Sequence, residues 1–177
     1  MTNSNCEMLD ECRHDKRCFN YFNCLDSPSG ITQEKFIQVK YKKLVPEAQM
    51  PTYASPGDAG MDLFAVKAAT VWAYHKAIIS TGIAMEIPGG YFGMIRPRSG
   101  LAVKYGLTAT SSGVIDSSYR GEIKVLLHNL GTQRYDISVG DRIAQLLILP
   151  VFHAILEETD ELSTSIRGEK GHGSTGK

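Results

Sequence analysis

The sequence predicts an all-β fold, a sandwich or a barrel, for the region that follows its first 33 residues. Short apolar segments follow one another at close intervals there, and their alternating polarity indicates strands with one buried face. Gly, Pro, Asn and Asp separate the segments, as they do at turns. No convincing amphipathic helix interrupts the pattern, so an α/β fold is not expected.

The N-terminal extension, residues 1–33, differs in composition from the rest of the chain. It contains all four cysteines, six residues apart: Cys6, Cys12, Cys18 and Cys24. Zinc sites usually separate paired cysteines by two to four residues, so this pattern does not predict one, although a metal or disulfide role stays open. We expect a flexible, reduced appendage of a cytoplasmic or nuclear protein, and leave open a partner that binds it.

Strands are expected in order along residues 34–158, the predicted β domain. The first alternates apolar and polar residues around Val39. A longer strand within residues 77–90 places four apolar side chains on one face: Ile79, Ile83, Met85 and Ile87. Further strands are expected within residues 91–95, 106–110, 122–130 and 142–152. The apolar pattern then fades, and residues 159–177 are expected to form a polar C-terminal arm.

Charge and hydropathy exclude several classes of function. Nineteen basic residues balance nineteen acidic ones, so no global field attracts nucleic acid or an anionic membrane. No apolar run approaches the roughly 18 residues that cross a bilayer, and the N-terminus lacks the apolar segment of a signal peptide. Any site for an anionic ligand must therefore be local.

The arm ends in a pattern that is similar to a phosphate-binding loop. Residues 171–177 read G-x-x-x-x-G-K, but a P-loop needs the strand–loop–helix order of an α/β fold, which this sequence does not predict. Its Gly, Ser and Thr residues still suit an anion. The arm is therefore expected either to fray or to lie over a site that is built elsewhere.

Two motifs combine glycine with charged residues at predicted turns. In PGDAGMDLFA, Asp62 suits either local hydrogen bonds of a turn or a hydrated cation. In RPRSGLAVKYG, Arg98 could fork to phosphate oxygens, Ser99 could donate its hydroxyl, and Gly100 would let a phosphate approach the backbone. The alternative for this second motif is a turn with solvated arginines.

The segment GVIDSSYRGEIKVLLHN, residues 113–129, suggests chemistry most strongly. Its apolar start leads into Asp116, and a turn at Tyr119 leads into the next strand, so we expect a β-hairpin that carries an acidic group partly away from water. Such a carboxylate is a plausible general base, and Tyr119 offers an aromatic face. Taken alone, the segment fits better an ordinary hairpin whose Asp caps a turn.

The segment VGDRIAQLLILP, residues 139–150, is an apolar strand with polar residues inside it. Arg142 and Gln145 interrupt the run. A buried amide needs hydrogen-bond partners, so Gln145 either satisfies a neighbouring backbone or orients a ligand or a water.

Taken in order, these stretches and the tail resemble the five sequence motifs of the trimeric deoxyuridine triphosphatase (dUTPase) family, over roughly residues 35–176. The resemblance implies a jelly-roll-like subunit, a homotrimer with active sites at subunit interfaces, and a C-terminal arm that covers a site formed by the other two subunits. The implied reaction converts dUTP and water to dUMP and pyrophosphate with Mg²⁺. It would limit uracil in DNA and supply dUMP for thymidylate synthesis.

The resemblance also implies roles for single residues. Asp116 would activate the water that attacks the α-phosphorus, and Gln145 would hold that water or the α-phosphate. Tyr119 would pack against the deoxyribose and leave no room for a 2′-hydroxyl, while Asp62 would reach Mg²⁺ through water. The implied phosphate-binding residues are Arg98, Ser99, Gly100, Arg167, Gly173, Ser174 and Thr175.

The base-binding residues include one of two departures from the family pattern. The backbone around Gly113 and Val114 would read the uracil edge, and His172 would stack on the uracil in place of the usual Phe or Tyr. The second departure is Ser118, where the family often has an acid. That acid is expected to be peripheral to the reaction.

His172→Phe is expected to bind dUTP at least as tightly as the wild type at neutral pH, because stacking on a base contributes about 1–3 kcal/mol. Wild-type affinity should change between about pH 5.5 and 7.5 as the imidazole titrates. Equilibrium binding across that range measures both effects. A flat profile that is unchanged in the Phe variant would contradict a stacking role.

Two alternative functions stay open. A dCTP deaminase of the same fold would need a further catalytic carboxylate at the cytosine amino group, and the sequence offers none that we can place. A catalytically inactive nucleotide-binding or interaction module would account for the extension. Release of pyrophosphate from dUTP, and of ammonia from dCTP, separates the three functions.

Overall fold

The computed structural model describes residues 36–109 and 113–171. The chain divides into two units, Met1–Ile37 and Gln38–Lys177. The helix and strands that the structure describes all belong to the second unit. The predicted domain boundary after residue 33 lies outside the described residues.

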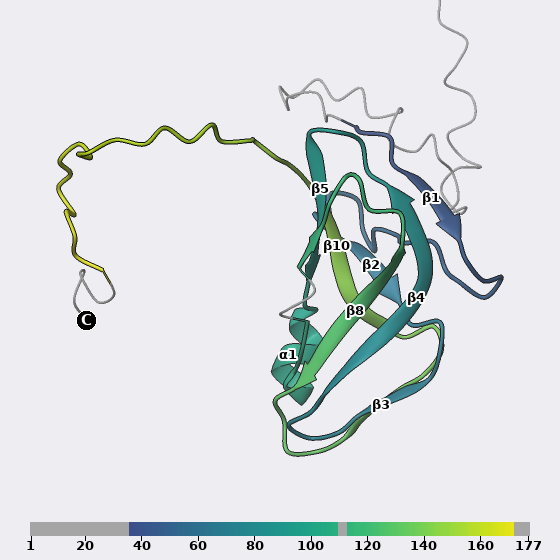
Figure 1. The fold of residues 1–177 in the computed structure, drawn as a ribbon. Helices are drawn as coiled ribbons and strands as arrows, with labels where there is room; N and C mark the ends of the chain where they lie inside the picture. The colour runs from purple at the N-terminus through teal and green to yellow at the C-terminus, as the bar shows by residue number, and fades with distance from the viewer. Residues whose placement is uncertain (1–35, 110–112, 172–177) are drawn as a thin grey trace, which may run out of the picture. The chain divides into compact units, whose positions relative to one another are not determined.

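The described residues contain ten strands in three antiparallel sheets, and the predicted all-β fold is confirmed (Figure 1). The first sheet has the order β1 (Lys40–Lys43), β4 (Lys76–Glu86), β8 (Glu122–Asn129), β6 (Leu107–Thr108). The second has the order β2 (Met61–Phe64), β10 (Arg142–Pro150), β5 (Tyr91–Arg96), β7 (Val114–Ile115). A third, two-stranded sheet pairs β3 (Ala69–Val71) with β9 (Tyr135–Ile137).

One buried core joins the strands, and it follows the alternation seen in the sequence. The four side chains predicted to share a face of β4 are all buried: Ile79, Ile83, Met85 and Ile87. The pairing of β4 with β8 shifts register between Ser80 and Ala84. Gly82 lies within this irregularity with a φ of 67°, and a Cβ there would lie 2.9 Å from Ala48 and Val45. Both its conformation and its close packing therefore require glycine.

Sequence analysis missed the one helix of the described residues, α1 (Ser99–Tyr105). It ends at Gly106, which has a left-handed φ of 69° and donates its N–H to the carbonyl of Ala102. With two turns, the helix is too short to show a helical period in the sequence. No helix within the described ranges is long and apolar enough to cross a membrane.

The predicted β-hairpin of residues 113–129 is wrong. β7 pairs with β5, whereas β8 pairs with β4 and β6, so the two strands belong to different sheets. Both strands are apolar on one face, and Ile115 and Ile123 are buried in the shared core. The connection between them therefore crosses from one sheet to the other, and this crossing positions the candidate site.

Candidate functional site

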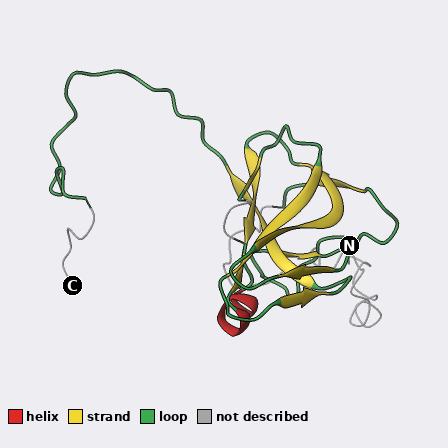
Figure 2. Cartoon of the chain, turned by 60° about the horizontal axis from the view of Figure 1, so that its bottom comes forward, coloured by secondary structure: helices red, strands yellow, loops and turns green. Residues whose placement is uncertain are grey.

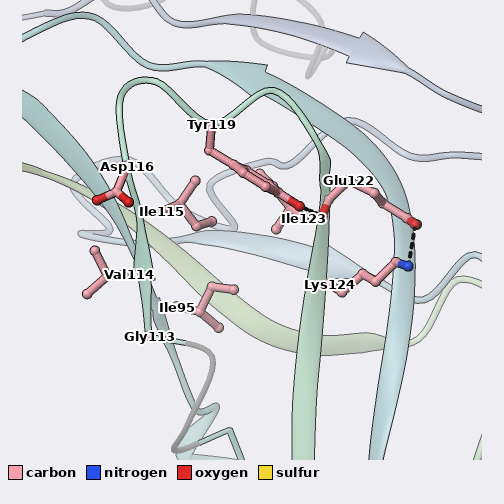
Figure 3. Close-up of a pocket in the computed structure, with 9 residues that line it drawn as sticks. All are labelled: Ile95, Gly113, Val114, Ile115, Asp116, Tyr119, Glu122, Ile123 and Lys124. Atoms are coloured by element: carbon pink, nitrogen blue, oxygen red, sulfur yellow. Dashed lines mark hydrogen bonds and ion pairs between the residues drawn. The ribbon is translucent and has the colours of Figure 1, made fainter.

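A pocket of about 360 Å³ lies between the two four-stranded sheets, at the connection from β7 to β8 (Figure 3). Its lining comes from β5, β7, β8 and the connection: Ile95, Gly113, Val114, Ile115, Asp116, Tyr119, Glu122, Ile123 and Lys124. The three isoleucines are buried and give the pocket an apolar side. Four residues that sequence analysis assigned to a site thus surround one pocket: Gly113, Val114, Asp116 and Tyr119.

Hydrogen bonds fix the connection that carries Asp116 and Tyr119. The N–H of Tyr119 donates to the carbonyl of Asp116 over 3.0 Å, which closes a turn. The Arg120 side chain donates through Nη1 to the carbonyl of Ser117, at 2.6 Å, and to that of Tyr119, at 2.9 Å. At the other end, the Tyr119 hydroxyl donates to the carbonyl of Glu122 over 3.0 Å. The backbone and the ring therefore hold one arrangement beside the pocket.

Asp116 is exposed in this chain. The sequence-based expectation that its own hairpin shields the carboxylate is not met, because the segment crosses between sheets and leaves Asp116 at the pocket mouth. Tyr119 is 46% exposed and Val114 is 63% exposed. Among the described residues, this side of the pocket is open to solvent.

A second cluster surrounds Asp62 on β2, which is 3% exposed. Arg142 donates from Nη1 to Oδ2 of Asp62 over 3.2 Å, and Nε of Arg98 lies 3.2 Å from Oδ1. The Arg98 contact is an ion pair without hydrogen-bond geometry, so Oδ1 has no hydrogen-bond donor. Nη1 of Arg98 donates to the carbonyl of Arg142 over 3.2 Å. One buried carboxylate thus anchors two guanidinium groups.

Gln145 joins this cluster through the strand register. It lies opposite Asp62 on β2 and opposite Arg96 on β5. Opposite residues on antiparallel strands present their side chains on the same face of the sheet. The predicted polar residue of β10 therefore lies on the Asp62 face, and its side chain is partly buried.

Ser99 and Gly100 form the first turn of α1, directly after Arg98. Both are exposed, and a Cβ added to Gly100 would meet no atom within 4 Å. The space beside this backbone is open, as a phosphate contact requires. Within the described residues, no hydrogen bond or ion pair connects these residues or Asp62 to the pocket at Asp116.

The segment after β10 has no helix or strand within its described residues, which end at residue 171 (Figure 2). Arg167 is exposed and donates to carbonyls of its own loop, from Nε to Lys170 at 3.0 Å and from Nη2 to Gly171 at 3.2 Å. The other predicted tail residues lie outside the described residues: His172, Gly173, Ser174 and Thr175. Five large apolar side chains after β10 are each at least 87% exposed: Phe152, Ile155, Leu156, Leu162 and Ile166. The last two lie within the predicted arm, and the other three precede it.

Sequence analysis left Arg142 without a role, although it noted the residue. A polar residue within an apolar strand was the available signal, but the contact with Asp62 becomes visible only once β10 is paired with β2. Glu122 and Lys124, which line the pocket from β8, were missed as well. In the sequence, Glu122 and Lys124 alternate with apolar residues, which is the pattern of solvent-exposed positions on a strand.

A directly ligated metal centre finds no support among the residues that the structure describes. They contain no group of three or more His, Cys, Asp or Glu side chains that could hold an ion. Asp62 instead offers a single carboxylate with one oxygen that lacks a hydrogen-bond donor.

Comparison with known proteins identifies the family. The dUTPase family model matches residues 46–176. The deoxyuridine 5′-triphosphate nucleotidohydrolase of Syntrophotalea carbinolica is 46% identical over 145 residues, which cover 80% of this chain and 99% of the relative. A structure of Staphylococcus bacteriophage 80alpha dUTPase with dUPNHPP has a TM-score of 0.72 and 32% identity, and covers 78% of this chain and 98% of that one.

A third comparison concerns a metal. A mutant dUTPase of S. aureus phage phi11, whose structure describes the coordination of a structural Mg(II) ion, has a TM-score of 0.65 and 27% identity. The match covers 72% of this chain and 100% of that one. The family model matches most of the sequence, and a curated relative is 46% identical to it. This chain therefore belongs to the dUTPase family.

Proposed function

We propose that this chain hydrolyses dUTP to dUMP and pyrophosphate, with Asp116 as the general base for a water that attacks the α-phosphorus. The observation that carries the proposal is the pocket in which the Asp116 carboxylate and the Tyr119 ring lie at the mouth of an apolar space between the sheets. The activity limits uracil in DNA and supplies dUMP for thymidylate synthesis. Pyrophosphate release from dUTP, with dCTP and dTTP as controls, tests it.

The edge of β7 supports recognition of uracil. Among the strands that the structure describes, β7 is the last of its sheet and pairs only with β5. The carbonyl of Gly113 accepts the N–H of Ile95, and alternate residues of a strand direct their backbone groups to opposite edges. The N–H and carbonyl of Val114 therefore point to the open edge. A donor and an acceptor side by side match the edge of uracil, and thymine would bring its 5-methyl group against this strand.

The apolar pocket, the Tyr119 ring and the open edge of β7 favour hydrolysis of a uracil nucleotide over deamination of a cytosine nucleotide. Deamination would need a second free carboxylate, and Glu122 is the other acid that lines the pocket. Its Oε1 accepts the N–H of Gly82 over 2.9 Å, and its Oε2 lies 3.5 Å from Nζ of Lys124. Figure 3 shows this side chain directed towards Lys124 and away from Asp116. Glu122 is thus occupied in holding β8 against β4.

The cluster around Asp62 would bind the triphosphate. Two unit charges 4 Å apart interact by about 4 kcal/mol at an effective dielectric near 20, so the fixed cation of Arg98 contributes substantially to binding a polyanion. Ser99 and Gly100 would add their hydroxyl and backbone N–H, and Gln145 would hold the water or the α-phosphate. This division leaves the base and sugar to the pocket and the phosphates to the Asp62 cluster.

The residues present fit Mg²⁺ held mainly by the phosphates. The ion keeps several of its waters, and the donor-free Oδ1 of Asp62 suits a hydrogen bond from such a water. When bound, Mg²⁺ would supply positive charge to the leaving pyrophosphate. Asp62 would then have two roles, because the same carboxylate anchors Arg98 and Arg142.

Arg142→Met is expected to lower the free energy of unfolding by roughly 1–3 kcal/mol, because the buried carboxylate of Asp62 loses its hydrogen-bond donor. The KM for dUTP should rise, since the carboxylate of Asp62, which pairs with Arg98, loses the donor that helps to fix it. Urea denaturation at one protein concentration and steady-state kinetics measure the two effects.

Lys40→Met is the matched control. It removes an exposed ion pair with Glu86, for which a change below about 1 kcal/mol is expected. An Arg142 variant as stable and as active as this control would show that the buried cluster has no such role.

The exposed apolar side chains of residues 152–166 and the open pocket support a homotrimer of jelly-roll-like subunits with exchanged C-terminal arms. Apolar side chains as exposed as Phe152, Ile155 and Leu156 favour burial against another copy. The arm would then bring Arg167 and the residues that follow it to a site formed by the other two subunits. In this arrangement the neighbouring copies supply the shielding that Asp116 lacks in the single chain.

A further inference from the structure

Gly121 has no residue-specific role in the function described above, yet its surroundings are unusually close. A Cβ added there would collide with the hydroxyl of Tyr119 and would lie 2.6 Å from Cζ and 3.0 Å from Cε2 of the same ring. Real Cβ atoms essentially never show contacts under 3.0 Å. The three nearest atoms all belong to Tyr119, so the closest collision is with this ring.

The backbone conformation of Gly121 is not what requires a glycine. Gly121 is absent from the positive-φ glycines of the described residues, which include Gly82 and Gly106. An L-residue could adopt its φ, and only the missing side chain matters. Gly121 therefore provides space for a ring that lies directly against the backbone.

Two contacts together define the position of that ring. The hydroxyl of Tyr119 is held by the carbonyl of Glu122 (Figure 3). The ring lies against Gly121. Glu122 is itself fixed, because its side chain accepts the N–H of Gly82 on β4. The ring is 46% exposed, so it keeps surface for a ligand while it rests on the start of β8.

We propose that Gly121 is a positioning residue that sets the selectivity for deoxyribonucleotides over ribonucleotides. The inference rests on the proposed packing of Tyr119 against the deoxyribose. Discrimination against a 2′-hydroxyl needs a ring that cannot move away from the sugar. The close packing of the ring against Gly121 fixes the position of the ring. A methyl group at position 121 displaces the ring, so that it no longer holds one fixed position against the sugar.

The test compares the ratio of kcat/KM for dUTP to kcat/KM for UTP in the full-length chain. Gly121→Ala is expected to lower the ratio about tenfold or more, since a displacement of about 1 Å can change rates by up to 100-fold. Gly89→Ala is the matched control, because a Cβ there meets nothing within 4 Å and its φ is not positive. This control should keep the wild-type ratio.

A double-variant cycle separates positioning from a general structural role. In the Tyr119→Ala background the colliding ring is absent, so adding Gly121→Ala should change the ratio less than twofold. If Gly121→Ala alone fails to fold, the double variant must still fold. A wild-type ratio in Gly121→Ala, an equal loss in both backgrounds, or an unfolded double variant would overturn the inference. A wild type without preference for dUTP over UTP would overturn the proposed role of Tyr119 itself.

Discussion

Asp116→Asn is expected to lower the turnover of dUTP about 100-fold or more, because general-base catalysis contributes roughly 10²- to 10⁴-fold. Asparagine has the same shape as aspartate but cannot accept the proton of the attacking water. The turn should survive, since it uses the main-chain carbonyl of Asp116 and not its side chain. Binding of dUTP should change little, because the lost interaction acts on the transition state.

Single-turnover kinetics and binding of a non-hydrolysable dUTP analogue measure the two quantities separately. Asp136→Asn is a suitable control: this carboxylate accepts a hydrogen bond from Thr70 and pairs with Arg134, and it does not line the pocket. It should keep the wild-type turnover. Weaker binding with unchanged turnover in the Asp116 variant would count against the assignment of Asp116 as the base.

Deletion of residues 165–177 is expected to abolish most turnover while preserving the proposed trimer. The truncated chain keeps Phe152, Ile155, Leu156 and Leu162, the exposed apolar residues proposed to pack against a neighbouring copy. It loses Arg167 and the tail, which would close the site, exclude water and bind the phosphates. Light scattering reports the assembly, and the kcat/KM for dUTP reports the loss.

Two single variants refine this test without shortening the chain. Arg167→Ala removes the proposed phosphate contact and should reproduce a large part of the loss. Lys170→Ala removes a neighbouring cation whose hydrogen bonds with Arg167 use only its main-chain N–H and carbonyl, so its effect should be small. Full activity of the truncated trimer would show that the arm is not a lid.

Local patterns in the sequence predicted those features that depend on neighbouring residues. The apolar face of β4 follows from alternation alone, and it is buried as expected. The positions of Gly113, Asp116 and Tyr119 around one pocket follow from a single short motif. In each of these cases a few consecutive residues carry the information.

Features that depend on strand pairing could not be predicted in this way. The segment around Asp116 reads as a hairpin because its two apolar strands are close in sequence, yet they pair with different partners. For the same reason, the contact between Arg142 and Asp62 cannot be read from the chain, since 80 residues separate them. Asp116 is exposed among the described residues, because its segment crosses between the two sheets instead of folding back as a hairpin.

A crystal structure with a non-hydrolysable dUTP analogue tests most directly whether Asp116 activates water in a site shared between subunits. We predict a carboxylate of Asp116 within about 3 Å of a water placed in line with the α-phosphorus. Tyr119 of the same copy should lie against the sugar, and Arg98 and Gln145 on the phosphates should come from a neighbouring copy. A base bound far from Tyr119, or a complete pocket within each isolated subunit, would contradict this account.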